Sequence, residues 1–453
     1  MSNNIFIFRR DFRIKDNTAL NYCIENSEYL YPIFIFTPEQ VIDNTFKSDN
    51  AVQFMCESLN HLKKKVKNLV YCKGNYIDVI TDIVKKNNID GIYTNTDYTK
   101  YSIKREKDIE KLCKKLNIDF KYYHDITLYE PGTKLTISGS YYQKFTPFYN
   151  LCLKDEPRKS STKNGDKKYK KCKTKYSITD TSKFYKYNDM LHVNGGRKEA
   201  LKILKKIREF KDYDKTRNTL SIETTNLSAY LKFGCISIRE CYEKFKKTFG
   251  KKDPLIRQLI WRDFYYHLGY GFIDRFGDSL KEQYDKIKWD NNRNNFNRWK
   301  EGRTGYPVID ACMTQLNETG YMHNRGRLLV SSFLIKNLGI DWRWGEKYFA
   351  QSLVDYDVLV NNGNWQWTSG SGADSQPYFR VFNPWLQSER YDKDCEYIKY
   401  WLPNLEDVEN KHLHQWDKFH TEYNMKDIDY IKPIVDYKES KENSLKIYKK
   451  YLK

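Results

Sequence analysis

The run Thr-Thr-Asn-Leu-Ser at 224–228 combines three hydroxyl side chains with the expected start of a helix. Such hydroxyls accept hydrogen bonds from the first backbone N–H groups, and N–H groups left free at a helix start attract anions. The run is therefore typical of an ordinary helix cap, and it could also hold a phosphate. Tyr213 and Arg217, just upstream, add a phenol and a guanidinium.

Tryptophan is unevenly distributed along the chain. All ten indoles lie between residues 261 and 416. A packed aromatic core explains some of them, but their confinement to one part of the chain makes that explanation incomplete. They are Trp261, Trp289, Trp299, Trp342, Trp344, Trp365, Trp367, Trp385, Trp401 and Trp416.

Composition indicates a basic globular protein. The 453 residues carry a formal net charge of +20, and 40% of them are hydrophobic. This length favours two or three packed units. A positive surface attracts polyanions, so nucleic acid is the first candidate partner. The alternative is that an AT-rich genome encodes proteins rich in Lys, Asn, Ile and Tyr whatever their function, so the positive charge alone does not establish a nucleic-acid partner.

Several classes of protein do not fit the sequence. It contains no run of the roughly 18 apolar residues that a membrane-spanning helix needs, and no signal-peptide pattern. We therefore expect a soluble intracellular protein of the cytoplasm or nucleus. The ten cysteines form no C-x-x-C pair and no Cys/His cluster with metal-ligand spacing, which predicts reduced, mostly buried thiols and no metal site.

Short apolar runs alternate with helical patterns over the first 130 residues. Strands are predicted at 5–8, 30–36, 68–72, 91–95 and 119–123, and a helix is predicted at 102–116. This alternation is typical of an α/β fold with a doubly wound parallel sheet, whose switch-point crevice can hold a ligand. Residues 1–130 are therefore predicted to form the first domain.

Residues 131–195 are predicted to link this domain to a helical one. Between 151 and 175 there are ten Lys or Arg residues against three acids, which predicts an exposed basic linker. Its lysine-rich core could be a nuclear localisation signal or a segment that contacts DNA, although such runs are more often simply exposed to solvent. Long amphipathic segments then predict a mostly helical domain at 196–453.

Long segments of the chain resemble the photolyase/cryptochrome family. The strongest matches are TGYPVIDACMTQLNETGYMHNRGR (304–327), IDWRWGEKYF (340–349) and LVDYDVLVNNGNWQWTSGSGADSQPYFRVFNP (353–384). FIFRRDFRIKDNTAL (6–20), QKFTPF (143–148), TTNLSAYLKFGCIS (224–237) and QLIWRDFYYHL (258–268) follow the same family in the same order. The resemblance implies an α/β antenna domain followed by a helical domain that binds FAD and DNA.

The resemblance assigns a set of residues to FAD. It places Arg327 and Asp355 in a buried salt bridge beside the isoalloxazine, Asp357 at a flavin-contacting position and Asn361 opposite flavin N5. Without the resemblance, an Asp-x-Asp spacing is more often a solvated or capping pair. Plant cryptochromes place Asp where this chain has Asn361, which favours repair over signalling. The other implied cofactor-binding residues are Tyr213, Arg217, Thr224, Thr225, Leu227, Ser228 and Arg262.

A second set of residues is implied for DNA and for electron transfer. A damaged base pair must leave the helix stack to reach a flavin, so the site needs aromatic walls and polar groups for the flipped lesion. The resemblance supplies Trp261 and Trp367 as walls and Gln258 and Asn324 as polar groups. Arg262, Arg325 and Arg380 match positions near the DNA backbone, and Trp289, Trp342 and Trp365 match the family's electron-transfer chain.

The resemblance favours one lesion while leaving alternatives open. Photolyases for (6-4) products and animal cryptochromes carry His at the positions of Asn324 and Leu328, so the cyclobutane pyrimidine dimer is the better substrate. Gln258 stands where cyclobutane-type enzymes place Glu, and Gln is what the (6-4) branch uses. The run Asn-Arg-Gly-Arg at 324–327 resembles the DASH-type branch of the family. DASH-type proteins usually lack an indole at the position of Trp367, so Trp367 favours repair of duplex DNA. Folate-binding members carry an acid where this chain has Lys104, so the antenna chromophore stays open.

We therefore predict a monomeric, light-driven lyase that repairs cyclobutane dimers in double-stranded DNA. Excited reduced FAD would pass an electron to a flipped-out dimer, and the electron would return after the ring opens. The alternatives are a (6-4) or dual-lesion photolyase and a cryptochrome-type blue-light receptor. A general basic single-strand binder is a third hypothesis, but it leaves the ordered Trp matches unexplained.

Overall fold

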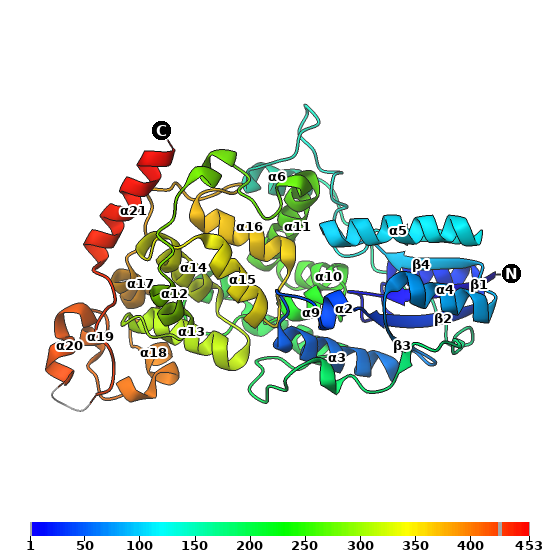
Figure 1. Cartoon of the computed structure of the whole chain (residues 1–453), viewed down its shortest axis with the longest axis horizontal. Coiled ribbons are helices and arrows are strands. Elements are labelled where there is room, and N and C mark those ends of the chain that lie inside the picture. Colours follow the sequence, from blue (N-terminus) through cyan, green and yellow to red (C-terminus); the bar gives the residue numbers. More distant parts are fainter. Residues whose placement is uncertain (1, 425–427, 453) are drawn as a thin grey trace.

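Figure 1 shows the chain as a computed structural model in which residues 2–424 and 428–452 are described. A six-stranded sheet lies at one end of the molecule and a larger helical region at the other, and α5 runs along the sheet. This arrangement confirms the predicted fold class. The strands are β1 (Ser2–Phe8), β2 (Ser27–Phe36), β3 (Val70–Lys73), β4 (Gly91–Asn95), β5 (Asp119–Tyr123) and β6 (Ser177–Ile178).

The sheet has the order β5-β4-β1-β2-β3-β6, and the first five of these strands are parallel. Alternating side chains of β1 enter two different cores. Phe6 and Phe8 pack in one core with residues of α1 (Thr18–Glu25) and α3 (Asp49–Lys63). Ile5 and Ile7 pack in the other with residues of α4 (Tyr76–Asn87) and α5 (Lys100–Leu116). Burial on both faces explains the continuous apolar runs of these strands.

The carboxyl end of β1 docks on the helical region. The Phe12 backbone N–H donates to the Phe233 carbonyl over 3.1 Å. Gly234 has a positive φ of 62°, and a Cβ atom there would lie 2.3 Å from the Arg10 carbonyl oxygen. Only glycine allows the two backbones to approach so closely. This contact brings Arg10 from the first domain toward the cavity described below.

The basic segment is not simply an exposed linker. Leu30 and Tyr169 form a β-bridge, and β6 pairs antiparallel with β3. Tyr169 and Cys172 are buried, while the Lys168 ammonium donates to the carbonyl of Ser27 over 2.7 Å. Residues 168–178 therefore cover the edge of the sheet. Apolar side chains alternating with lysines made this pairing possible, and the net charge concealed it.

Three helices of the helical region begin at an aspartate cap. Asp253 caps α11 (Pro254–Gly271), Asp341 caps α15 (Trp342–Ser352) and Asp357 caps α16 (Val358–Ser369). Such caps fix where each helix starts, and so which side chains face the cavity. The remaining helices in this region are α7 (Arg197–Lys205), α8 (Tyr213–Thr216), α9 (Ser228–Lys232), α10 (Ile238–Phe249), α12 (Arg293–Lys300), α13 (Pro307–Thr319), α14 (Asn324–Ser332), α17 (Pro384–Tyr391), α18 (Glu396–Trp401), α19 (Asn410–Leu413), α20 (Trp416–Asn424) and α21 (Tyr437–Tyr451).

Two short helices, α2 (Pro38–Val41) and α6 (Phe145–Cys152), complete the set. All ten cysteines are buried and unpaired, as predicted. Within the described parts of the chain, every helix is too short or too polar to span a bilayer.

Candidate active site

A cavity of about 810 Å³ opens in the helical region. This volume lies within the range of small-molecule and cofactor sites. The cavity brings together every predicted site residue except Trp289 and Trp342. Those lining it are Tyr213, Arg217, Thr224, Thr225, Leu227, Ser228, Gln258, Trp261, Arg262, Asn324, Arg325, Arg327, Asp355, Asp357, Asn361, Trp365, Trp367 and Arg380.

An ion pair lies in the cavity wall. Arg327 Nη2 donates to Asp355 Oδ2 over 3.0 Å, and Arg327 Nε donates to the Met322 carbonyl over 2.9 Å. Asp355 Oδ1 is buried and has no hydrogen-bond partner among the described residues. A buried acceptor without a partner is costly, so it favours a ligand that presents an N–H group. A flavin ring system satisfies this requirement.

Asp357 connects the cavity to the first domain. One of its carboxylate oxygens caps α16, while the other accepts from Arg10 and, over 2.6 Å, from the Tyr266 hydroxyl. Burial acts to raise the pKa of Asp357, but Arg10 and Arg262 outweigh it and hold that pKa well below its usual value. Both oxygens are thus engaged within the protein. Asp357 lines the cavity chiefly as a residue that positions α16.

Asn361 is hydrogen-bonded to Glu346, a residue that the sequence analysis did not assign to the site. Its Nδ2 donates to the Glu346 Oε1 over 3.1 Å and to the Glu346 carbonyl over 3.2 Å. These two bonds fix the orientation of the Asn361 amide. Burial raises the pKa of Glu346 to about 7. Glu346 lies on α15 and Asn361 on α16, so only the packing of the two helices brings them together.

Glu346→Gln should change the pH dependence of stability. The pKa of glutamate in an unfolded chain is about 4.3. Its folded pKa is higher, so ionisation of Glu346 destabilises the fold as pH rises from about 4.3 to about 7. Glutamine keeps the acceptor for Asn361 without that cost. We expect the variant to gain unfolding free energy over the unaltered chain at pH 8 but not at pH 4. Equal differences at both pH values, measured by urea unfolding, would contradict this.

The run at 224–228 does not act as an ordinary helix cap. Leu227 is the residue that precedes α9, and no side chain accepts a hydrogen bond from the start of this helix. Asn226, just before Leu227, has a positive φ of 51°. Thr224, Thr225 and Ser228 line the cavity at this point. The backbone N–H groups at this helix start, which no side chain caps, fit a phosphate-bearing ligand.

Lys232 is a further cavity residue that the sequence analysis missed. It lies at the end of α9, within the same conspicuous run of sequence. Burial, followed by the charge of Arg10, lowers the pKa of Lys232 to about 7. Lys232 and Arg217 both line the cavity, and such cations suit a pyrophosphate. The donor set, together with the free Asp355 oxygen, therefore fits FAD.

Flavin binding should weaken above neutral pH because of Lys232. A phosphate favours the charged amine, so binding requires proton uptake once the free protein has lost that proton near pH 7. The flavin dissociation constant should rise by up to about tenfold per pH unit above that value, one pKa unit being worth a factor of ten. Lys232→Met should flatten this rise in fluorescence titrations at pH 6 and 9. If the dissociation constant of Lys232→Met still rose as steeply with pH, Lys232 would not be the group that takes up the proton.

Two indoles and two amides also line the cavity. Trp261 stacks on Phe145 with ring centroids 3.6 Å apart, so one indole face is covered and only the other can meet a ligand. Trp367 lines the cavity as well. Among the described residues, neither Gln258 nor Asn324 has a side-chain hydrogen-bond partner. Free amides beside apolar rings suit a planar polar ligand such as a base.

The three arginines assigned to the DNA backbone lie in different places. Arg380 is exposed at the mouth of the cavity, and Arg325 is half-buried there. Arg262 donates to the Ile126 carbonyl over 2.6 Å and lies over the Tyr266 ring, inside the cavity wall. Arg262 is therefore better placed for the cofactor than for a phosphate on the protein surface.

The three tryptophans predicted to transfer electrons have different surroundings. Trp365 is buried and lines the cavity. Trp342 is buried and lines a separate surface depression together with Trp344. Trp289 is half-buried and packs edge-on against Tyr448 at 5.7 Å. The order Trp365, Trp342, Trp289 remains a prediction for electron transfer.

No histidine is among the described residues that line the cavity. His323 is nearest in sequence to Asn324, but its side chain is buried and its Nδ1 accepts from the Arg325 backbone N–H over 3.1 Å. Burial, aided by Arg327 and Arg325, lowers the pKa of His323 to about 4. His323 therefore caps α14 as a neutral residue.

Comparisons with known proteins agree with this geometry. Residues 4–164 match the family described as DNA photolyase, and residues 255–450 match the FAD binding domain of DNA photolyase. A deoxyribodipyrimidine photo-lyase of Buchnera aphidicola is 36% identical, covering 99% of this chain and 97% of its own.

Two solved structures extend the comparison. An archaeal photolyase from Sulfolobus tokodaii, described with two FAD molecules, is 38% identical with a TM-score of 0.88 and covers 99% of this chain and 100% of its own. A Synechocystis cryptochrome is 28% identical with a TM-score of 0.90, covering 98% and 99%. The match along the whole chain and the cavity suited to FAD lead to one conclusion: this chain belongs to the DNA photolyase family.

Proposed function

We propose that this protein uses light to split cyclobutane pyrimidine dimers in DNA. The observation that carries the proposal is that one cavity contains both sets of residues. Asp355, Arg217 and Lys232 form its cofactor-binding part, whereas Trp261 and Trp367 form walls suited to a flipped pyrimidine pair. The two bound groups would then lie next to each other.

When bound, reduced FAD supplies a light-excited electron donor. The protein contributes position and environment. Arg327 and Asp355 would hold one side of the cofactor, and Asn361, whose Nδ2 donates to Glu346, lines the same cavity. Leu328, Phe349, Leu353 and Val360 add apolar surface that excludes water. The proposed reaction requires no side chain to act as a nucleophile.

The lesion is recognised by hydrogen bonding and stacking. Gln258 and Asn324 can donate to carbonyl oxygens and accept from imide N–H groups of a pyrimidine pair. The rings of Trp261 and Trp367 provide apolar contact, and Arg380 at the mouth provides charge for the adjoining phosphates. A flipped dimer in duplex DNA would satisfy all three kinds of contact.

The cavity lining supports the cyclobutane dimer over the (6-4) product. Repair of the latter in this family depends on a histidine proton donor, and the described lining contains Asn324 and Leu328 at the corresponding positions. His323 cannot substitute, because it is buried and uncharged near neutral pH. Gln258 is the feature that favours the (6-4) or dual-lesion alternative, while the Synechocystis relative favours a cryptochrome.

The test is to illuminate the flavin-loaded protein with one of two DNA substrates. One contains only cyclobutane dimers and the other only (6-4) products, and chromatography counts the lesions remaining in light and in darkness. We expect loss of the cyclobutane dimer in light alone. Loss of the (6-4) product would support the alternative lesion. Loss of neither, with intact photoreduction, would support a light receptor.

Trp342→Phe should separate photoreduction from repair. Phenylalanine fills much of the buried site but is far harder to oxidise than an indole. Light and an external thiol should therefore no longer reduce the flavin, as followed by its absorbance. After chemical reduction of the flavin, the variant should repair dimers as well as the unaltered chain. Failure of the pre-reduced variant would make Trp342 a structural residue, and Trp344→Phe provides the neighbouring control.

A further inference from the structure

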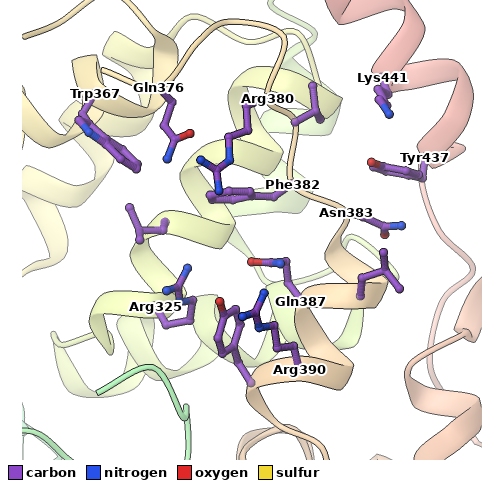
Figure 2. A pocket seen from close by; sticks show the side chains of 14 residues that line it. Arg325, Trp367, Gln376, Arg380, Phe382, Asn383, Gln387, Arg390, Tyr437 and Lys441 are labelled. Carbon is purple, nitrogen blue, oxygen red and sulfur yellow. The ribbon is translucent and has the colours of Figure 1, made fainter. Parts of the chain in front are cut away.

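A groove of about 640 Å³ opens beside the active-site cavity (Figure 2). It is bordered by α14, the loop 376–383, α17 and the start of α21. The groove and the cavity are continuous, because several residues line both. These shared residues are Arg325, Leu328, Trp367, Gln376 and Arg380.

The groove is positively charged. Its described lining residues include Arg325, Arg380, Arg390 and Lys441, and none of them is acidic. Figure 2 shows the three guanidinium groups gathered around the opening. Cations concentrated in a concave surface without acids attract a polyanion, with several phosphates as the natural match.

Two of these cations are held in place by an aromatic ring. Arg325 lies over the Tyr391 ring at 4.2 Å, and its Nη2 donates to Asn218 Oδ1 over 2.6 Å. Arg390 lies 5.4 Å from the same ring. Stacking orders a guanidinium without using all of its N–H donors. Arg325 Nε is in fact buried without a partner among the described residues.

The groove also exposes apolar and aromatic surface. Leu386 is 60% exposed, and Phe382 and Tyr437 line the groove as well. The outside of a base-paired helix presents phosphates and sugars, so it has little use for such rings. Unpaired nucleotides present bases that stack on aromatic side chains while their phosphates meet cations. The mixed lining therefore favours a single strand over a duplex.

We propose that this groove binds unpaired nucleotides of the damaged strand that flank the flipped dimer on one side. The inference rests on the proposed function, because continuity with the cavity identifies which strand enters the groove. A strand leaving Trp367 must pass Arg325 and Arg380 before it reaches Tyr437 and Arg390. The protein would thus keep unpaired both the dimer and several nucleotides beside it in the same strand.

The test compares DNA substrates that differ only in pairing beside the dimer. One duplex is fully paired, and two others carry three mismatched pairs on one side or the other of the dimer. Binding is measured by anisotropy at two salt concentrations, with an undamaged single strand as a fourth ligand. The variants are Arg390→Ala/Lys441→Ala and Tyr437→Ala. Arg298→Ala/Lys411→Ala is the matched control, because it removes two charges from residues that line neither cavity.

We expect the unaltered protein to bind one mismatched duplex more tightly than the paired one. Tyr437→Ala should weaken that complex by about 5- to 150-fold, the range for loss of one base stack. The double variant should lower the salt slope on the single strand by about 1.4, or about 0.7 for each lost contact. The control should change neither preference nor flavin content.

Several results would overturn the proposal. They are a double variant that behaves like its control, equal losses on paired and mismatched duplexes, and equal effects of mismatches on both sides. Failure of the proposed function is seen separately, as an unaltered protein that neither prefers nor repairs the dimer. Even then, the undamaged single strand reports whether the groove binds nucleotides.

Discussion

Asp355→Ala is expected to purify with little flavin. The substitution removes the partner of Arg327 together with a buried carboxylate oxygen that has no partner among the described residues. Loss of one partner from a buried pair costs about 3 to 5 kcal/mol because a charge is left uncompensated. That corresponds to a loss in flavin affinity of at least about a hundredfold if the cost is borne by the loaded state.

Absorbance ratios at the flavin and protein maxima measure the occupancy directly. Asp394→Ala removes an acid that does not line the cavity and should retain the flavin of the unaltered chain. Asp355→Asn keeps an acceptor oxygen but not the charge, so its flavin occupancy should lie between those of Asp355→Ala and Asp394→Ala. Full occupancy and unchanged melting of Asp355→Ala would remove Asp355 from the cofactor site.

Trp261→Ala should weaken binding of damaged DNA and leave undamaged DNA unaffected. The exposed indole face can meet only a base that has left the helix, since the other face is covered by Phe145. Loss of one base stack costs about 1 to 3 kcal/mol, or roughly 5- to 150-fold in affinity. Competition binding on matched duplexes with and without one cyclobutane dimer measures the difference.

Arg380→Ala is the comparison for this experiment. An exposed arginine that meets phosphate should contribute equally to both duplexes, and its loss should lower the salt slope by about one unit. Trp261→Phe retains a ring on Phe145 and should recover much of the lost selectivity. Equal losses on both duplexes for Trp261→Ala would make Trp261 a core residue.

Local patterns in the sequence predicted much of the fold. The strands from β1 to β5 and helix α5 were predicted within a few residues, because their apolar runs and periodicity are strong. Strand β6 was missed. Its pairing with β3 depends on a long-range contact, and the lysines around Tyr169 resembled a solvated charge run.

The cavity was predicted through family resemblance, since spacing alone did not bring Thr224, Gln258 and Asp355 together. The supporting residues were not predictable in this way. Glu346 reaches Asn361 only through packing of α15 on α16, and Arg10 reaches Asp357 across the two domains. Contacts of this kind depend on tertiary geometry, which carries no local signal in the sequence.

The groove beside the cavity was also invisible to sequence reasoning. Arg325, Arg390 and Lys441 come from three helices that are far apart in the chain. Each is an ordinary basic residue in a chain with 79 of them, so composition could not single them out. The family resemblance had assigned Arg325 to the DNA backbone, but only the concave arrangement on the surface brings Arg390 and Lys441 into the same groove.

The central claim is that one cavity holds the flavin and the flipped dimer next to each other. Its most direct test is the fluorescence lifetime of the reduced flavin while DNA is titrated into the loaded protein. Electron transfer to an adjacent dimer provides a new route for decay, so dimer-containing DNA should shorten the lifetime and undamaged DNA should leave it unchanged. Saturating, dimer-specific binding with no change in lifetime would contradict the claim, because the dimer would then lie outside the cavity.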